Sequence, residues 1–337
     1  MISVEKEFKN IMTRLSVSLL FFAILFPLLT GGASALGELL ISLFPRSDAV
    51  YIVSDLASSL AYLISFVLPV PFFYLISRGV KVYPLKLELK FPEPHPVLSY
   101  FAIILAGLAI ITPMTYVNSL LFPVSYGDME IFGFDFSKPY MLVLTFIASA
   151  IVPAFAEELL FRGLLVSNLR PYGKSVAVIV SAVAFGLMHQ NPLQLLYATA
   201  AGIVFGVVYV ETESIWCCIA LHFANNFISV IQAYCSYIFD EYTASVFSFF
   251  FVVLTGILGI ICAVFLASSM KMRSAAKRSV SQRSYWGRYE LSPSDFCEKV
   301  NFVSVAFKNP VFVIYIVACA AEIVSFGALL YVSSLGG

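Results

Sequence analysis

The sequence predicts an all-α fold, a polytopic bundle of about eight to nine transmembrane helices. Hydrophobic residues make up 60% of the chain and charged residues 12%, whereas soluble domains have roughly 45–50% and about 25%. Apolar runs recur along the 337 residues, most of them close to the roughly 20 residues that a helix needs to cross a bilayer. Alternating strand patterns are absent, which excludes a membrane β-barrel. An integral membrane protein is therefore expected.

The first apolar run extends from Leu15 to Phe44 and contains Pro27. We interpret it as one long, kinked helix, although the small residues at 33–35 also resemble a signal-peptide cleavage site. Further spans are predicted at Leu56–Ile76, Val97–Phe122, Tyr140 to about Arg170, 175–192, 194–210, 214–239, 244–270 and 310–333.

The distribution of charge predicts the orientation of the bundle. Twenty basic and twenty acidic residues cancel, so nothing favours a nucleic-acid partner. Of the twenty Lys and Arg residues, Arg46 and Lys138 fall on one side and Arg162 lies inside a helix, which leaves seventeen on the other side. The positive-inside rule then places the N-terminus in the cytoplasm and the C-terminus outside. The expected location is the plasma membrane of a bacterium, with the lipid bilayer as a partner.

A basic loop at 271–307 precedes the last span. Ser292 followed by Pro293 is typical of a helix start, with Ser as N-cap and Pro at the first helical position. We therefore expect an interfacial helix there, ending near Lys308, whose basic surroundings favour contact with anionic lipid. The six cysteines include no CxxC pair, and most are expected to fill the core.

Three charged side chains, Glu157, Glu158 and Arg162, interrupt the fourth span. Each costs at least ~2.5–3.5 kcal/mol at bilayer depth, so the cluster needs a compensating role. Glu158 and Arg162 are four residues apart and can pair on one helix face. Glu157 is rotated by about 100° from Glu158 and lacks that partner. One carboxylate is therefore expected to be structural and the other free for chemistry, while Pro153 should kink the helix nearby.

Two histidines lie in later spans, where an ionisable group is a functional hypothesis by default. Asn226 follows His222 by four residues, and His189 follows Phe185 by the same spacing, so each pair shares a helix face. If the fourth span continues to about Arg170, Glu157 lies about 20 Å from the cytoplasmic end. His189 and His222 then lie about 21 Å and 14 Å from the starts of their helices. The three side chains can converge at mid-depth, inside the bundle.

A free carboxylate, two imidazoles and a carboxamide are suited to activating water against a carbonyl group. Glu157 would be the general base, and His and Asn side chains can donate hydrogen bonds to a developing oxyanion. Alternatively, Glu157, His189 and His222 could hold a zinc ion, although the chain has no HExxH helix. No other cofactor is expected.

The three motifs, Glu157-Glu158-xxx-Arg162, Phe185-xxx-His189 and His222-xxx-Asn226, together resemble the CPBP family. This family comprises the type II CAAX prenyl endopeptidases and the bacteriocin-processing Abi proteins. The resemblance implies an intramembrane endopeptidase with its active site inside the bundle, acting on a membrane-associated, lipidated or peptide substrate. It further implies that Glu157 and His189 activate water, that Glu158 pairs with Arg162, and that His222 and Asn226 form the oxyanion hole. A glutamic mechanism is favoured over a metal-dependent one.

The resemblance covers about residues 140–240, which we take as the catalytic membrane core. Residues 1–139 are then about three N-terminal transmembrane helices, and 241–337 are C-terminal helices with the basic loop, a candidate for substrate choice. Three alternatives remain open: a buried ion pair that only fixes helix packing, a non-catalytic bacteriocin-immunity or scaffold protein, and a proton-coupled transporter. No internal repeat supports the transporter, and Glu322, in the middle of the last span, has no assigned role.

Overall fold

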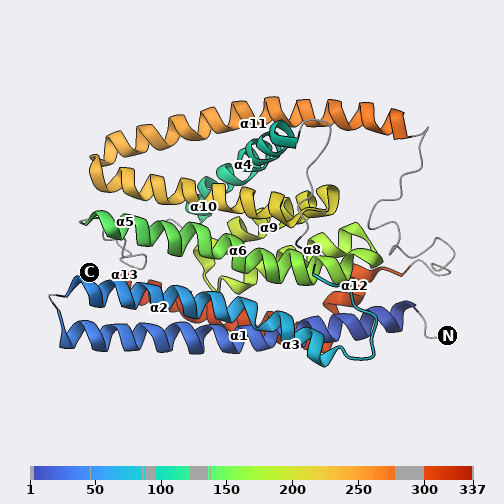
Figure 1. The fold of residues 1–337 in the computed structure, drawn as a ribbon, viewed down its shortest axis with the longest axis horizontal. Helices are drawn as coiled ribbons and strands as arrows, with labels where there is room; N and C mark the ends of the chain where they lie inside the picture. Colours follow the sequence, from blue (N-terminus) through green and yellow to red (C-terminus); the bar gives the residue numbers. More distant parts are fainter. Residues whose placement is uncertain are drawn as a thin grey trace.

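The computed structural model describes residues 4–45, 47–85, 87, 96–121, 136, 138–277 and 300–335, and these contain helices and no strand (Figure 1). The long helices run roughly along one direction, and the described chain starts and finishes at opposite ends of the bundle. In chain order the α-helices are α1 (Val4–Leu43), α2 (Asp48–Val67), α3 (Pro69–Ile76), α4 (Pro96–Leu121), α5 (Pro139–Phe146), α6 (Val152–Glu158), α7 (Ser167–Leu169), α8 (Lys174–Met188), α9 (Pro192–Thr212), α10 (Ile215–Ile238), α11 (Glu241–Lys277), α12 (Phe302–Phe307) and α13 (Pro310–Leu335).

Seven helices in the described part of the chain are long and apolar enough to cross a membrane. Two shorter apolar helices, 99–114 within α4 and 174–188 in α8, add to them. The chain is thus an all-α integral membrane protein, as its composition predicts. An odd number of crossings agrees with the opposite positions of the two ends.

Most helix bounds lie within a few residues of those predicted, with two clear exceptions. The first apolar run was expected to begin at Leu15, but α1 begins at Val4. The second span was expected to begin at Leu56, but α2 begins at Asp48. Polar residues in its first turns gave this stretch the appearance of a loop, whereas Ser47 is extended and forms its N-cap. α1 is a single helix of 40 residues through Pro27, as expected for one long helix.

Some predicted features lie outside the described residues, among them the helix start at Ser292 and Pro293. The described end of that region forms the short helix α12, capped by the Asn301 side chain, which accepts a hydrogen bond from the Ser304 amide at 3.1 Å. Glu322 is exposed on α13. The described cysteines are free, and most of them are buried, as predicted for core residues.

The fourth span is helical without interruption from Pro139 to Tyr172, which confirms that it continues past Gly163. Two of its segments are π-helical, η2 (Ile147–Ile151) and η3 (Leu159–Val166), and they flank α6. Pro153 is the second residue after η2 and cannot donate a backbone hydrogen bond, so a local change of helical register is expected there. Single π-turns in α-helices often mark functional sites.

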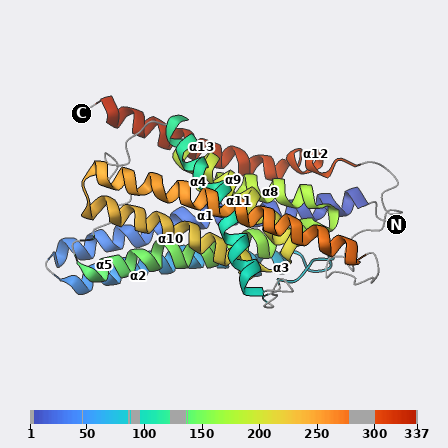
Figure 2. The same ribbon diagram turned by 90° about the horizontal axis from the view of Figure 1, so that it is seen from above.

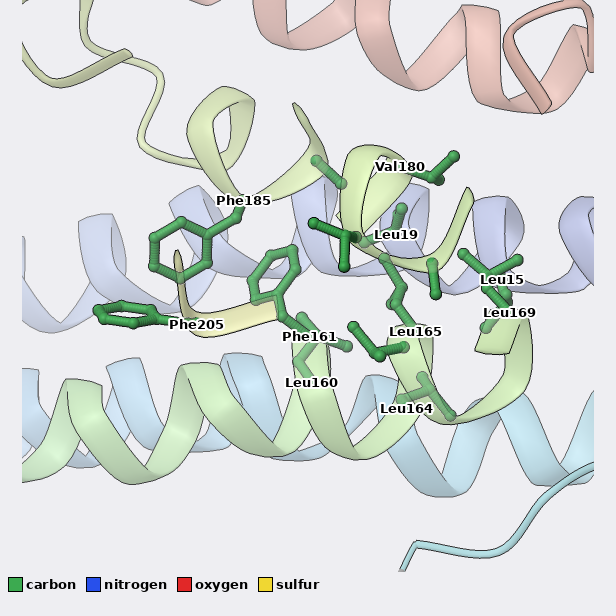
Figure 3. Close-up of a cluster of buried hydrophobic side chains, with 14 of the residues drawn as sticks. Leu15, Leu19, Leu160, Phe161, Leu164, Leu165, Leu169, Val180, Phe185 and Phe205 are labelled. Carbon is green, nitrogen blue, oxygen red and sulfur yellow. The ribbon is translucent and has the colours of Figure 1, made fainter. Parts of the chain in front are cut away.

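The π-helical segment η3 lies in the centre of the hydrophobic core. Its Leu160, Phe161 and Leu164 are fully buried. Figure 3 shows them together with Leu15 and Leu19 of α1 and with side chains of α8. The segment that carries Arg162 is therefore surrounded by protein. α4 crosses the other helices steeply (Figures 1 and 2), and α11 packs along it.

α8 and α9 approach each other closely through small residues. A Cβ atom on Gly202 would lie 2.9 Å from the Cα atom of Ala182, and one on Gly186 would lie 2.9 Å from the Leu195 carbonyl oxygen. Glycine at these positions lets the two backbones pack without side chains between them. The close packing also brings the carbonyl group of Gly202 to the charged cluster.

Candidate active site

Glu158 and Arg162 form a fully buried ion pair, with 3.0 Å between Arg162 Nη1 and Glu158 Oε1. Arg162 Nη2 donates a second hydrogen bond to the carbonyl oxygen of Gly202 on α9 at 3.1 Å. The guanidinium group also lies over the rings of Phe185 and Phe205, at 4.7 and 5.0 Å from their centroids. Buried charges persist only when they are paired and hydrogen-bonded. This network meets that requirement for Nη1 and Nη2 of Arg162, while its Nε atom has no hydrogen-bond partner among the described residues.

Glu158 also accepts a hydrogen bond from a second helix. His222 Nδ1 on α10 lies 2.9 Å from the same Glu158 Oε1 that binds Arg162. Because an ionised carboxylate can only accept, Nδ1 carries a hydrogen in this arrangement. Phe205 stacks on the imidazole at 4.9 Å between ring centroids. Glu158 and Phe205 together fix the orientation of His222.

Glu157 is almost completely buried and has different partners. Its Oε1 atom accepts a hydrogen bond from the hydroxyl group of Tyr62 on α2. Its Oε2 atom has no hydrogen-bond partner among the described residues and lies 3.9 Å from His222 Nε2. The helix spacing predicted one carboxylate that is not paired with Arg162, and the structure shows this arrangement. Tyr62 was missed, because a tyrosine in an apolar span gives no signal of its own.

His189 follows the last residue of α8. Its Nδ1 atom lies 2.9 Å from the carbonyl oxygen of Phe185 one turn earlier, and a carbonyl can only accept. A neutral ring therefore carries its hydrogen on Nδ1, which leaves the lone pair of Nε2 available. His189 also interacts electrostatically with Glu157 and His222. The Phe185 ring lies 5.2 Å from that of His189 and walls the site as predicted.

Among the described residues, the side chain of Asn226 forms no hydrogen bond with Glu157, Glu158 or His222. Its Oδ1 atom accepts a hydrogen bond from Asn225 Nδ2 at 3.1 Å. Asn225 Nδ2 also bonds the hydroxyl group of Tyr197 on α9. Sequence spacing correctly placed Asn226 one turn after His222, but it did not indicate these two neighbours. With Oδ1 occupied, the Nδ2 group of Asn226 remains available as a donor.

Glu157, His189 and His222 were the alternative set of zinc ligands. Among the described residues, no three His, Cys, Asp or Glu side chains are placed to hold a metal ion. Both imidazoles use Nδ1 within the protein. The remaining pair, Glu157 Oε2 and His222 Nε2, is 3.9 Å apart.

One segment of the chain is similar to known proteins. Residues 139–228 match the family model described as "Type II CAAX prenyl endopeptidase Rce1-like". The chain is 36% identical over 93 residues to a Bacillus subtilis (strain 168) protein named "Putative membrane peptidase YdiL", which covers 26% of this chain and 37% of that protein. The similarity thus spans little more than a third of the relative's length. No solved structure shows a significant match.

Proposed function

We infer that this chain, whose residues 139–228 match the type II CAAX prenyl endopeptidase family model, is an intramembrane endopeptidase of the CPBP family. In this proposal, water activated by Glu157 and His189 hydrolyses a peptide bond. The main support is the buried Oε2 atom of Glu157, which lies 3.9 Å from His222 Nε2 and, like Oε2 of Glu158, has no hydrogen-bond partner among the described residues. A buried acceptor without a partner costs about 1–3 kcal/mol, so a functional reason for keeping it is expected.

The proposed first step is the attack of water on the carbonyl carbon. Glu157 Oε2 takes one proton from the water as the new C–O bond forms, and His189 Nε2 accepts a hydrogen bond that orients the same water. The π electron pair of the carbonyl moves to its oxygen and produces an oxyanion. The C–N bond then breaks, and the leaving amine takes the proton that Glu157 holds.

His222 and Asn226 are proposed to stabilise the oxyanion. Asn226 would donate through Nδ2. His222 already directs Nδ1–H to Glu158, so donation from Nε2 requires the doubly protonated ring. Two carboxylates and one guanidinium carry a net charge of −1, and this proton would bring the buried cluster to neutrality. Charge balance thus supports the donor role of His222.

The substrate is proposed to be a membrane-associated peptide or protein, prenylated or not, in the plasma membrane of a bacterium. Two alternatives make different predictions. A scaffold or immunity protein would need the Glu158–Arg162 pair only for packing. A proton-coupled transporter would move a solute across the membrane, with Glu157 carrying the coupled proton. Neither requires cleavage of a peptide bond.

The test uses the purified full-length chain in liposomes with two fluorogenic probes, a farnesylated peptide ending in a CAAX sequence and its unprenylated counterpart. Glu157→Gln and His189→Ala should each lower turnover by at least about 100-fold, as expected when general base catalysis is lost, while the thermal unfolding midpoint stays close to that of the wild type. Mass spectrometry identifies the cleaved bond. Full activity in either variant would refute the proposal.

Metal dependence is tested in the same preparation. Elemental analysis should find no stoichiometric metal in active protein, and dialysis against a chelator should leave turnover unchanged. If neither probe is cleaved, membrane proteomes of cells with wild-type and Glu157→Ala protein are compared. A protein that accumulates uncleaved only with the variant would identify the substrate, and identical proteomes would favour a scaffold.

A further inference from the structure

The contact between Tyr62 and Glu157 joins two parts of the chain. Tyr62 lies on α2, outside the family segment 139–228. Its hydroxyl group donates to Glu157 Oε1, and its side chain is only partly exposed. The proposed general base is therefore held by a helix that the family comparison does not include.

The tyrosine ring is itself fixed by aromatic neighbours. Its centroid lies 4.8 Å from that of Phe66 on the same helix and 5.6 Å from that of Phe26 on α1. Phe66 in turn packs at 4.6 Å on Phe22, and both of these rings are almost completely buried. In Figure 1 α1 and α2 run antiparallel, and α2 packs against α6, the helix with Glu157. This aromatic cluster places the hydroxyl group at a defined point.

A carboxylate group has two equivalent oxygens, and rotation about its terminal torsion is soft. A carboxylate without a fixed partner would present either oxygen to the site and would sample other orientations. The hydroxyl group of Tyr62 removes this freedom because it occupies Oε1. Oε2 is left free, buried and 3.9 Å from His222 Nε2.

We propose that Tyr62 is a positioning residue, which holds Oε1 of Glu157 so that Oε2 alone faces the reacting water. This inference rests on the proposed peptidase function. It adds a contribution of the N-terminal helices to a site whose other groups lie in 139–228. Such an arrangement pre-organises the base before substrate binds.

The kinetic test compares Tyr62→Phe with Tyr315→Phe in the liposome assay, using the probe that the wild type cleaves. Tyr315 is a matched control, because its buried hydroxyl group donates to the Ala184 carbonyl oxygen at 2.9 Å, away from Glu157. Tyr62→Phe should lower kcat by about tenfold with KM changed less than twofold, since a hydrogen bond to the base is lost but no substrate contact. Tyr315→Phe should retain kcat. Unchanged kcat in Tyr62→Phe, or equal losses in both variants, would overturn the proposal.

A second test does not need turnover. Thermal unfolding midpoints are measured for the wild type, Tyr62→Phe, Glu157→Ala and the double variant. Tyr62→Phe should lower the midpoint in the wild-type background and have little effect when Glu157 is already absent. Additive effects would show that the two side chains do not interact, whatever the activity. Coupling in a protein that cleaves no substrate would refute the peptidase function while keeping the Tyr62 contact.

Discussion

Glu158 is the residue on which the buried cluster depends, because one of its oxygens bonds both Arg162 and His222. The pairing of Glu158 with Arg162 follows from their spacing, and the chain's sequence was sufficient to predict it. The link to His222 depends on how α10 packs against α6, and no local pattern encodes that. Tyr62 lies 95 residues from Glu157 in the chain, which places their contact beyond any periodicity argument.

A first prediction, at the scale of single residues, concerns Arg162. Arg162→Met should lower the free energy of unfolding by about 3–5 kcal/mol, because Glu158 is left buried and uncompensated. The double variant Glu158→Gln with Arg162→Met should recover part of this loss, since both charges are removed. Thermal and denaturant unfolding in detergent measure the effect. A loss no greater than that of an exposed control such as Lys174→Met would contradict this account.

At the scale of elements, the end of the fourth span could be predicted from the depths at which Glu157, His189 and His222 lie in the membrane. His189 and His222 reach Glu157 only if the helix continues to about Arg170, and the structure shows that it does. The two π-helical segments could not be predicted, because they arise from packing and from the register change near Pro153. The early start of α2 was also hidden, because polar residues in its first turns obscure the apolar pattern.

The close packing of α8 on α9 gives a second prediction. Gly202→Ala should destabilise the protein and lower turnover, because the new methyl group would meet the Ala182 backbone at 2.9 Å and displace the carbonyl group that binds Arg162. Gly256→Ala on α11 is the matched control, with no atom within 4 Å of the added Cβ. It should be neutral or slightly stabilising, since Ala favours helix over Gly. The unfolding midpoint and turnover are measured for both variants. Equal effects in the two variants would contradict the role given to Gly202.

At the scale of the whole molecule, the helical membrane bundle followed from hydropathy. Seven helices of the described residues are long and apolar enough to span the membrane, and the two shorter apolar helices are needed to reach the predicted eight to nine. The side that faces the cytoplasm remains a prediction of the positive-inside rule. Contacts define the two ends: Lys174 pairs with Glu211 at 2.6 Å at one end, and Lys138 pairs with Asp48 at the other. These exposed pairs contribute little stability, but they mark positions for labelling.

The third prediction is the orientation itself. In a variant without native cysteines, Lys9→Cys should be protected from an impermeant maleimide in intact cells and react only after permeabilisation. Lys138→Cys should react in intact cells. The reverse pattern would invert the bundle and assign the basic loop 271–307 to the outside. Retained thermal stability of both variants serves as the control.

The short length of α8 has a consequence for how water reaches the site. With 15 residues it spans about 22 Å, less than the roughly 30 Å of hydrocarbon. The chain then turns back through Gln190, whose φ angle is +51°, and Asn191, which caps α9. Non-helical backbone at this depth is tolerated only against protein or beside a water-filled space. The reversal beside His189 therefore needs protein or a water-filled space around it, and a water-filled space at this point would supply the water that the proposed hydrolysis consumes.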